Sequence, residues 1–391
     1  MTLLSGDAIP KAEVGMSAYW LERLLYYHPS LLLYVRDLLD AVTAYIPRVI
    51  VDAILESPVM GPFGLSLEGT LMFADIDGFT PLAERFSQMA SQEGAEELTE
   101  LVNRFLDILM GIALKYGGDL QKFGGDAGMF LFQGPEHALR AVAASLEVQQ
   151  AMKSQMREVE TRFGRFPLRV AIGLGCGRLV GLSFGDQEGR ELAPVGPPLL
   201  SMGKAQMAAP PEEILLDALT LEACGPSLYC EPVGEGLYQV VGLRDFPSAH
   251  GAFSLIQVPQ LEDQERLTWI LSRLDALTPY LAPGLLERLV AAPSLDRLRL
   301  WSDHRQVTIM MLSVAGLTDL MPYWGDDTRL QQAIEGPDAA FKQMRDTVHR
   351  YDGIVNMIGV SPKGPYLMVL FGAPRSHEDD PLRAVLAALE L

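Results

Sequence analysis

Hydrophobic residues follow a helical period in several segments of the chain. Across residues 94–114 apolar side chains recur at spacings of four and three, which forms one apolar stripe on a helix, and the stripe consists of Leu98, Val102, Phe105, Leu109 and Ile112. Gly117 and Gly118 follow, and glycine supplies the left-handed conformation that ends many helices. A second helix is predicted from about residue 135 to 152. An apolar stretch over residues 20–35, broken by Pro29, predicts further helices that pack on the domains or on a partner.

Short apolar runs between these helices predict β-strands. Residues 70–80 read TLMFADIDGFT, an apolar run that ends at acidic residues and Gly78. Residues 120–132 read LQKFGGDAGMFLF, which predicts a hairpin around a glycine turn. A glycine-rich β segment over residues 169–184 and a strand, turn and helix over residues 192–209 follow. This order predicts an α+β fold, a ferredoxin-like split βαβ sheet with helices on one face.

The chain also contains an internal repeat. AVTAYIP at residues 41–47 resembles ALTPYLAP at 276–283, TLMFADIDGFT at 70–80 resembles VTIMMLSVAGLT at 307–318, and RAVAASLEV from Arg140 resembles RAVLAALEL from Arg383. Two copies of one domain with a few loop insertions produce such a pattern. We therefore expect an N-terminal helical segment (1–64), a first domain (65–255), a helical linker (256–302) and a second, incomplete domain (303–391).

Composition and charge narrow the class of protein. The chain has 391 residues, of which 49% are hydrophobic, and 50 acidic against 31 basic residues give a net charge of −19. This composition is typical of a folded protein and opposes binding to nucleic acids or anionic lipids. Three cysteines are too few for a disulfide framework or a zinc site. The apolar runs fall short of a membrane span, so we expect a cytoplasmic protein.

Two carboxylates stand out as candidate chemistry. Asp75 ends the first predicted strand, and Asp126 lies in the turn of the following hairpin. Neighbouring elements of a ferredoxin-like sheet could bring the two to one edge, where carboxylates and phosphates can hold Mg²⁺ and assist phosphoryl transfer. The alternative is structural: Asp75 and Asp77 cap the next helix, and the sequence GGD forms an ordinary turn.

The sequence then resembles a known family. FADIDGFT, LQKFGGDAGMFLF and PEHALRAVAASLEVQ resemble the class III adenylyl and guanylyl cyclase domain, and more closely the first domain of tandem, soluble, bicarbonate-type adenylyl cyclases. KGPYLMVLFGAPRSHEDDPLRAVLAALEL, from Lys363, resembles the second domain. The resemblance implies conversion of ATP to 3′,5′-cyclic AMP and pyrophosphate by two Mg²⁺ or Mn²⁺ ions between paired domains. Bicarbonate is a candidate effector.

The resemblance also assigns roles to residues. It implies that the metal ions are bound by Asp75, Asp126 and the backbone carbonyl of Ile76. Lys363 would read the purine, although Pro362 replaces the usual Asp before it, and the alternative is a solvent-exposed loop lysine. Lys122 would face the substrate phosphates or the degenerate pocket, there as part of an anion site for bicarbonate. The residues expected to line the nucleotide are Gly78, Phe79, Thr80, Lys122 and Gly125.

Several positions depart from the family pattern. Where the family carries an Asn that orients the ribose and an Arg that stabilises the phosphate, this chain has Leu200 and Lys204, and Ala193 replaces a second purine contact. The second copy has Ser313 and Ala315 at the positions of Asp75 and Asp77, which predicts one active and one degenerate site. Because the sequence stops inside an apolar helix, we expect a piece of a longer protein with further C-terminal domains, nearly inactive alone.

Two rival hypotheses remain open. The sequence GGDA also resembles the turn of diguanylate cyclases, but Ala127 and Gly128 stand where that family has Glu and Phe. The other rival is a pseudoenzyme that binds a nucleotide or a partner and serves as a regulatory module.

Overall fold

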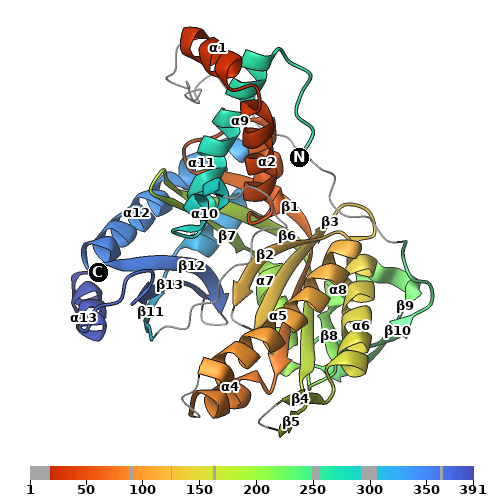
Figure 1. The fold of residues 1–391 in the computed structure, drawn as a ribbon. Helices are drawn as coiled ribbons and strands as arrows, with labels where there is room; N and C mark the ends of the chain where they lie inside the picture. Colours follow the sequence, from red (N-terminus) through yellow and green to blue (C-terminus); the bar gives the residue numbers. More distant parts are fainter. Residues whose placement is uncertain are drawn as a thin grey trace.

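The computed structural model describes residues 18–88, 92–124, 126–161, 164–248, 256–291, 306–361 and 364–391. A large sheet with its helices forms one side of the molecule, a smaller sheet with its own helices forms the other, and N-terminal helices project above both (Figure 1).

The large sheet is mixed, so the predicted α+β fold is confirmed. Its strands follow the order β2-β3-β1-β6-β8-β10-β9, and β7 also pairs with β6. All pairs are antiparallel except β6 with β8. The predicted hairpin is confirmed as β2 and β3, and the glycine-rich segment forms one continuous strand, β6. The strands are β1 (Phe63–Asp77), β2 (Gly118–Gly124), β3 (Ala127–Gln133), β6 (Arg169–Asp186), β7 (Gly189–Val195), β8 (Ile214–Asp217), β9 (Leu228–Gly234) and β10 (Leu237–Leu243).

One face of this sheet carries the predicted amphipathic helices. The apolar stripe is confirmed, because Phe105 and Leu109 are fully buried in the same cluster as Met72 and Phe130 of the sheet. A hairpin of β4 (Val159–Thr161) and β5 (Gly164–Phe166) extends below (Figure 1). The helices that follow the strands are α4 (Phe79–Gln88), α5 (Gln92–Lys115), α6 (His137–Gln155) and α8 (Ala218–Cys224), with the 3-10 turn η1 (Gly225–Ser227) after α8.

The expectation of helices on one face only was wrong. Neighbouring residues of β1, Leu71 and Met72, point to opposite faces, and both are fully buried, so both faces of the central strand need apolar cover. Leu71 joins a second core with residues of α2, α3 and α9. The elements on this side are α1 (Ala18–Tyr27), α2 (Leu31–Thr43), α3 (Arg48–Glu56), α7 (Pro197–Ala208), α9 (Asp263–Leu277), η2 (Thr278–Tyr280) and α10 (Leu285–Ala291).

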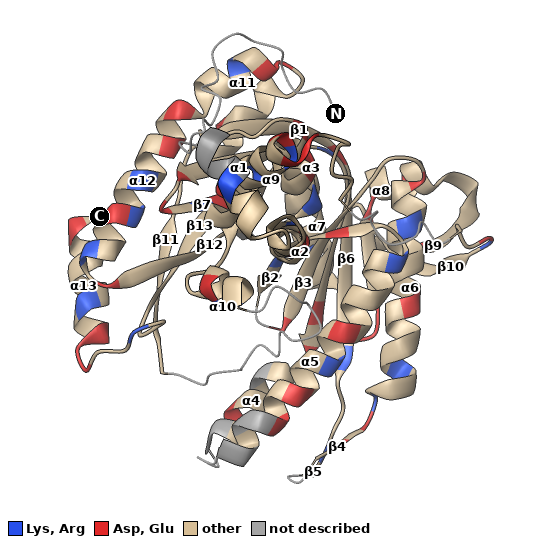
Figure 2. Ribbon diagram, turned by 45° about the horizontal axis from the view of Figure 1, so that its top comes forward, with Lys and Arg blue, Asp and Glu red and all other residues tan. Residues whose placement is uncertain are grey.

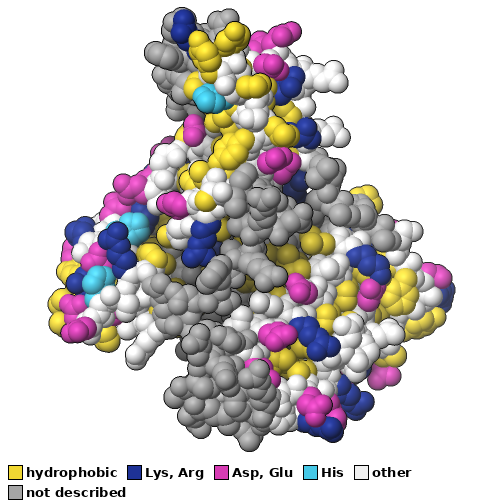
Figure 3. Space-filling model, in the orientation of Figure 1, with side chains coloured by type: hydrophobic (Ala, Val, Ile, Leu, Met, Phe, Trp, Pro, Cys, Tyr) yellow, Lys and Arg dark blue, Asp and Glu magenta, His cyan; other side chains and the backbone are white. Residues whose placement is uncertain are grey.

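The N-terminal helices pack mainly on α9. The predicted break near Pro29 is confirmed between α1 and α2, and Val35, Leu38 and Leu39 of α2 are buried beside α9. Hydrophobic side chains on the projecting end of these helices remain at the surface (Figure 3). Among the residues that the structure describes, no helix has both the length and the hydropathy of a membrane span.

The smaller sheet has the strand order β11-β13-β12, with both pairs antiparallel. The first three strands of the large sheet have the same arrangement, because β3 lies between β1 and β2. The elements are β11 (Thr308–Ser313), η4 (Leu317–Tyr323), α11 (Asp327–Ala333), α12 (Glu335–Arg350), β12 (Gly353–Ser361), β13 (Gly364–Phe371) and α13 (Asp380–Glu390).

The hairpin of β6 and β7 joins the two sheets through α12. The guanidinium of Arg345, 4% exposed, donates to both carboxylate oxygens of Asp186, at 2.6 and 3.2 Å. The Oδ1 atom of Asp338 accepts a hydrogen bond from the Gly185 N–H at 2.7 Å. Basic and acidic residues alternate along α12 and α13 (Figure 2). Charge pairs at this junction thus fix the smaller sheet against the larger one.

Candidate active site

Asp75 lies near the end of the central strand, between two small residues. Its register partners are Ala127 on β3 and Ala171 on β6. Asp126 directly precedes Ala127, in the turn between β2 and β3. The strand pairing therefore places Asp126 next to the register partner of Asp75.

The pKa values of both carboxyl groups are raised above their ordinary value. The pKa of Asp75 is raised to about 6, first by burial and then by the negative charge of Asp126, against the opposing hydrogen bonds from the Ile76 N–H and from Gln206. Burial also raises the pKa of Asp126. Two partly desolvated carboxylates that repel one another favour a bound cation.

Gln206 on α7 is a further member of the site. Its Nε2 atom donates a hydrogen bond to the Oδ2 atom of Asp75 at 3.3 Å. The contact requires α7 to lie directly on β6, and two glycines make this possible. A Cβ atom on Gly173 would lie 2.3 Å from the backbone nitrogen of Gln206. A Cβ atom on Gly175 would lie 2.3 Å from the backbone oxygen of Pro198. Sequence reasoning missed Gln206, although the alternating glycines of β6 were a signal for close approach of a helix.

Other predicted site residues surround the end of β1. Gly78 has φ +89°, a conformation that glycine adopts freely, and it turns the chain from β1 into α4. Phe79 begins α4 and packs against the core beneath the sheet, and Thr80 lies in the same helix. Ile76 is buried and pairs with Val170. Gly125, Pro362 and Lys363 lie outside the described residues.

Lys122 faces the junction between the two sheets. Its ammonium forms an ion pair with Glu191 on β7, and both side chains are less than one-fifth exposed. The same carboxylate accepts a 3.5 Å contact from the Ile358 N–H on β12. Lys122 thus links the edge strand β2 to β7 and, through Glu191, to the smaller sheet.

The residues that depart from the family pattern lie on β7, α7 and β11. Leu200 is 47% exposed on α7, and Ala193 is fully buried on β7. Lys204 forms an exposed ion pair with Glu235 at 3.0 Å. Ser313 ends β11 opposite Tyr366 of β13, and Asp75 lies two residues before the end of β1, opposite Ala127 of β3. None of these three positions on β7 and α7 supplies the polar group that the resemblance expects.

The donor set fits a hard divalent cation with few protein ligands. No group of three or more His, Cys, Asp and Glu side chains gathers as a metal cluster within the described part of the chain. Mg²⁺ commonly takes one or two carboxylates and completes its shell with water and substrate phosphates. Asp75 and Asp126 match that pattern.

Sequence comparisons place this site in a recognised domain. Residues 67–190 match the family model described as the adenylate and guanylate cyclase catalytic domain. The chain is 31% identical over 195 residues to adenylate cyclase type 10 of Homo sapiens and of Rattus norvegicus, which covers 48% of this chain and 12% of each relative. An uncharacterised protein of Mycobacterium tuberculosis is 26% identical over 197 residues, 49% of this chain and 32% of its own length.

Solved structures give similar matches. The adenylyl cyclase CyaB of P. aeruginosa is 27% identical, with a TM-score of 0.41 over 47% of this chain and 99% of its own. A bacterial light-regulated adenylyl cyclase is 18% identical, with a TM-score of 0.45 over 67% and 72%. From the family model and the curated relatives, the segment with Asp75 and Asp126 is homologous to the catalytic domain of adenylate and guanylate cyclases.

Proposed function

We propose that this protein is a nucleotide cyclase that converts ATP to 3′,5′-cyclic AMP and pyrophosphate at Asp75 and Asp126. One observation carries the proposal: Asp75 pairs with Ala127, the residue directly after Asp126, and both carboxyl groups lie inside the segment that matches the cyclase catalytic domain. The named relatives of type 10 are adenylate cyclases, which favours ATP over GTP.

Two Mg²⁺ or Mn²⁺ ions would supply the chemistry, by making the ribose 3′-hydroxyl more acidic and by neutralising the triphosphate. Asp75 and Asp126 would hold these ions, with the Ile76 carbonyl as a further ligand. Gln206 fixes the orientation of the Asp75 carboxylate through its hydrogen bond. Asp75 is ready to bind a cation when it is ionised, above its raised pKa of about 6.

The smaller sheet would act as the partner of the first domain. Its strand order β11-β13-β12 repeats that of β1, β3 and β2, which supports a tandem of two related domains. Ser313 in place of Asp75 supports one active site rather than two. Lys363 as the purine contact and bicarbonate as an effector near Lys122 remain predictions of the resemblance.

Turnover by purified protein tests the proposal. ATP or GTP is incubated with the protein and Mn²⁺, and cyclic nucleotide is quantified by mass spectrometry. We expect the wild type to form cyclic AMP from ATP. Asp75→Asn and Asp126→Asn should form at least a hundredfold less, because oriented charge is usually the largest catalytic contribution. Asp107→Asn, which changes an exposed acidic residue on α5, should leave turnover unchanged. Equal turnover by all four proteins would refute the assignment.

A regulatory module that binds nucleotide without turnover is the second candidate. The apolar side chains of Leu200 and Ala193 and the ion-paired Lys204 favour it, because the groups expected to orient the ribose and the phosphate are absent from those positions. Calorimetric binding of Mn²⁺-ATP by the wild type, lost in Asp75→Asn, together with no cyclic product, would support this module over the enzyme.

A further inference from the structure

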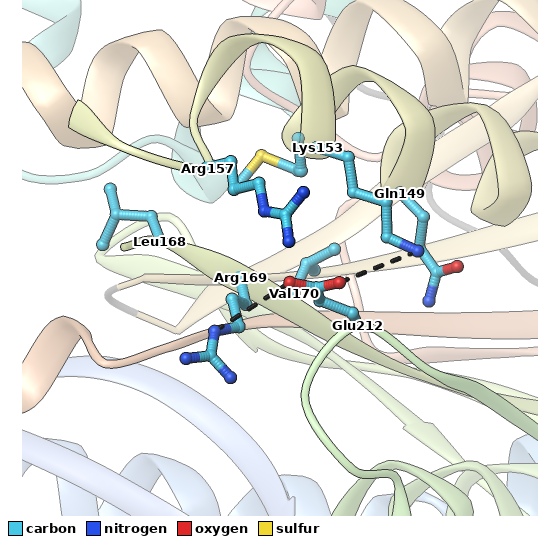
Figure 4. A pocket seen from close by; sticks show the side chains of 8 residues that line it. Gln149, Lys153, Arg157, Leu168, Arg169, Val170 and Glu212 are labelled. Atoms are coloured by element: carbon cyan, nitrogen blue, oxygen red, sulfur yellow. Dashed lines mark ion pairs between the residues drawn. The ribbon is translucent and has the colours of Figure 1, made fainter. Parts of the chain in front are cut away.

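A small basic pocket lies at the base of the large sheet, apart from Asp75 and Asp126. It opens between the C-terminal end of α6, the start of β6 and the segment before β8, and its volume is about 220 Å³ including the part open to solvent. The polar residues that line it are Gln149, Lys153, Arg157, Arg169 and Glu212, and they come from these three parts of the chain (Figure 4).

The charges in this pocket do not cancel. Glu212 is the single carboxylate among the lining residues, against three cations. Its distances to the Lys153 ammonium (3.8 Å) and to the Arg169 guanidinium (4.0 Å) exceed hydrogen-bond lengths. In the described residues, Arg157 forms no ion pair, and its guanidinium is directed into the pocket (Figure 4). N–H donors on three cations therefore remain available, although the whole chain carries a charge of −19.

A buried donor without an acceptor lies in the same pocket. Gln149 is 9% exposed, and its Nε2 atom has no hydrogen-bond partner in the described structure. Buried polar atoms are nearly always paired, and a bound ion or a water molecule is a common partner of those that protein groups leave unpaired. The Gln149 Nε2 atom is a donor, so its partner would be a hydrogen-bond acceptor. The free N–H groups of the three cations also call for an acceptor.

We propose that this pocket binds a small oxyanion of the phosphate type. Arginine matches phosphate oxygens with paired N–H donors, and lysine adds a point charge. The pocket is small and partly open to solvent, so it suits a free anion or one phosphate group of a larger molecule that extends into the solvent. Because Arg169 pairs with Asp77 at the end of β1, the pocket lies one strand away from the candidate active site. The inference does not depend on the cyclase proposal.

Calorimetry of the metal-free protein tests the pocket. Sodium phosphate, sodium pyrophosphate and AMP are titrated separately into the protein in EDTA at constant ionic strength, so that Asp75 and Asp126 hold no cation and repel anions. Binding of phosphate or pyrophosphate alone identifies a free anion as the ligand, whereas tighter binding of AMP identifies a nucleotide phosphate. The variants are Arg157→Ala, Gln149→Leu and the control Arg36→Ala, which removes an exposed arginine from α2.

We expect Arg157→Ala to weaken binding about tenfold or more, the effect of one charge-assisted hydrogen bond, and Arg36→Ala to leave it unchanged. Gln149→Leu should also weaken binding while the protein stays at least as stable, because an unpaired buried amide is removed. No binding of any of the three anions, or equal binding by Arg157→Ala and Arg36→Ala, would overturn the proposal. Unchanged affinity in Gln149→Leu would remove the buried amide from the site and overturn that part of it.

Discussion

The raised pKa of Asp75 gives a pH-dependent metal affinity. With a pKa of about 6, this carboxyl group is roughly nine-tenths ionised at pH 7 and about one-tenth ionised at pH 5. A cation binds the ionised form, so Mn²⁺ affinity is expected to fall about tenfold from pH 7 to pH 5. For a carboxyl group with an ordinary pKa of 3.8 the affinity would change little over this range.

Two substitutions should shift this pKa in opposite directions. Asp126→Asn removes the negative charge that raises the pKa of Asp75, so the pKa should fall. Gln206→Leu removes a hydrogen bond to the ionised form, so the pKa should rise. Neither direction follows from burial alone, which makes the pair of variants a specific test of the geometry.

The assay is an NMR titration of the Asp75 carboxyl carbon in metal-free protein, with Mn²⁺ affinity of the wild type measured by calorimetry at pH 5, 6 and 7. Because folding raises this pKa, its contribution to the free energy of unfolding is full below the ordinary value of 3.8 and is lost as the pH rises through about 6. A wild-type midpoint near 4, or the same midpoint in both variants, would refute the reasoning.

Three further predictions concern the packing. Gly173→Ala places a Cβ atom 2.3 Å from the backbone nitrogen of Gln206. The substitution should therefore lower the free energy of unfolding by about 1–3 kcal/mol and weaken Mn²⁺ binding. Equal urea midpoints for the wild type and the variant would contradict the close approach of α7 to β6. Arg345→Met should lower the free energy of unfolding by about 2 kcal/mol, less than the loss of a fully buried ion pair because Asp186 is 39% exposed. Adding Asp186→Leu to this variant should recover part of that stability, as measured by urea denaturation. The Asp119 carboxylate accepts hydrogen bonds from the first two N–H groups of α3. Asp119→Ala should therefore lower the free energy of unfolding by about 1–2 kcal/mol, and Asp119→Asn should lower it by less, as measured by thermal unfolding. Equal losses of stability in the two variants would exclude the role of Asp119 as a helix cap.

Local pattern predicted the elements around the site. The apolar stripe of α5 and the hairpin of β2 and β3 depend on the spacing of side chains along one segment, and such spacing is visible in a sequence. The position of Asp75 at a strand end and of Asp126 in a turn followed from the same patterns. Their convergence needed only that β1 and β3 be neighbours, as they are in a ferredoxin-like sheet.

Long-range packing could not be predicted in the same way. Gln206 is 131 residues from Asp75, and nothing in its own segment distinguishes it from a surface glutamine of α7. The second face of the sheet was also missed, because an apolar residue on β1 does not reveal which helix will cover it. Leu71 belongs to the same apolar core as residues of α2, α3 and α9, segments that lie on both sides of β1 in the chain.

The sequence by itself predicted many of the helices and strands and the places of Asp75 and Asp126 in them, and it contains segments that resemble one another. Only the tertiary structure decided that Gln206 binds Asp75, that Lys122 pairs with Glu191, and that three cations gather beside Gln149. The physical reason is that periodicity and turn chemistry act over a few residues, whereas pKa shifts, ion pairs and pockets depend on distances between segments that only the packed fold sets.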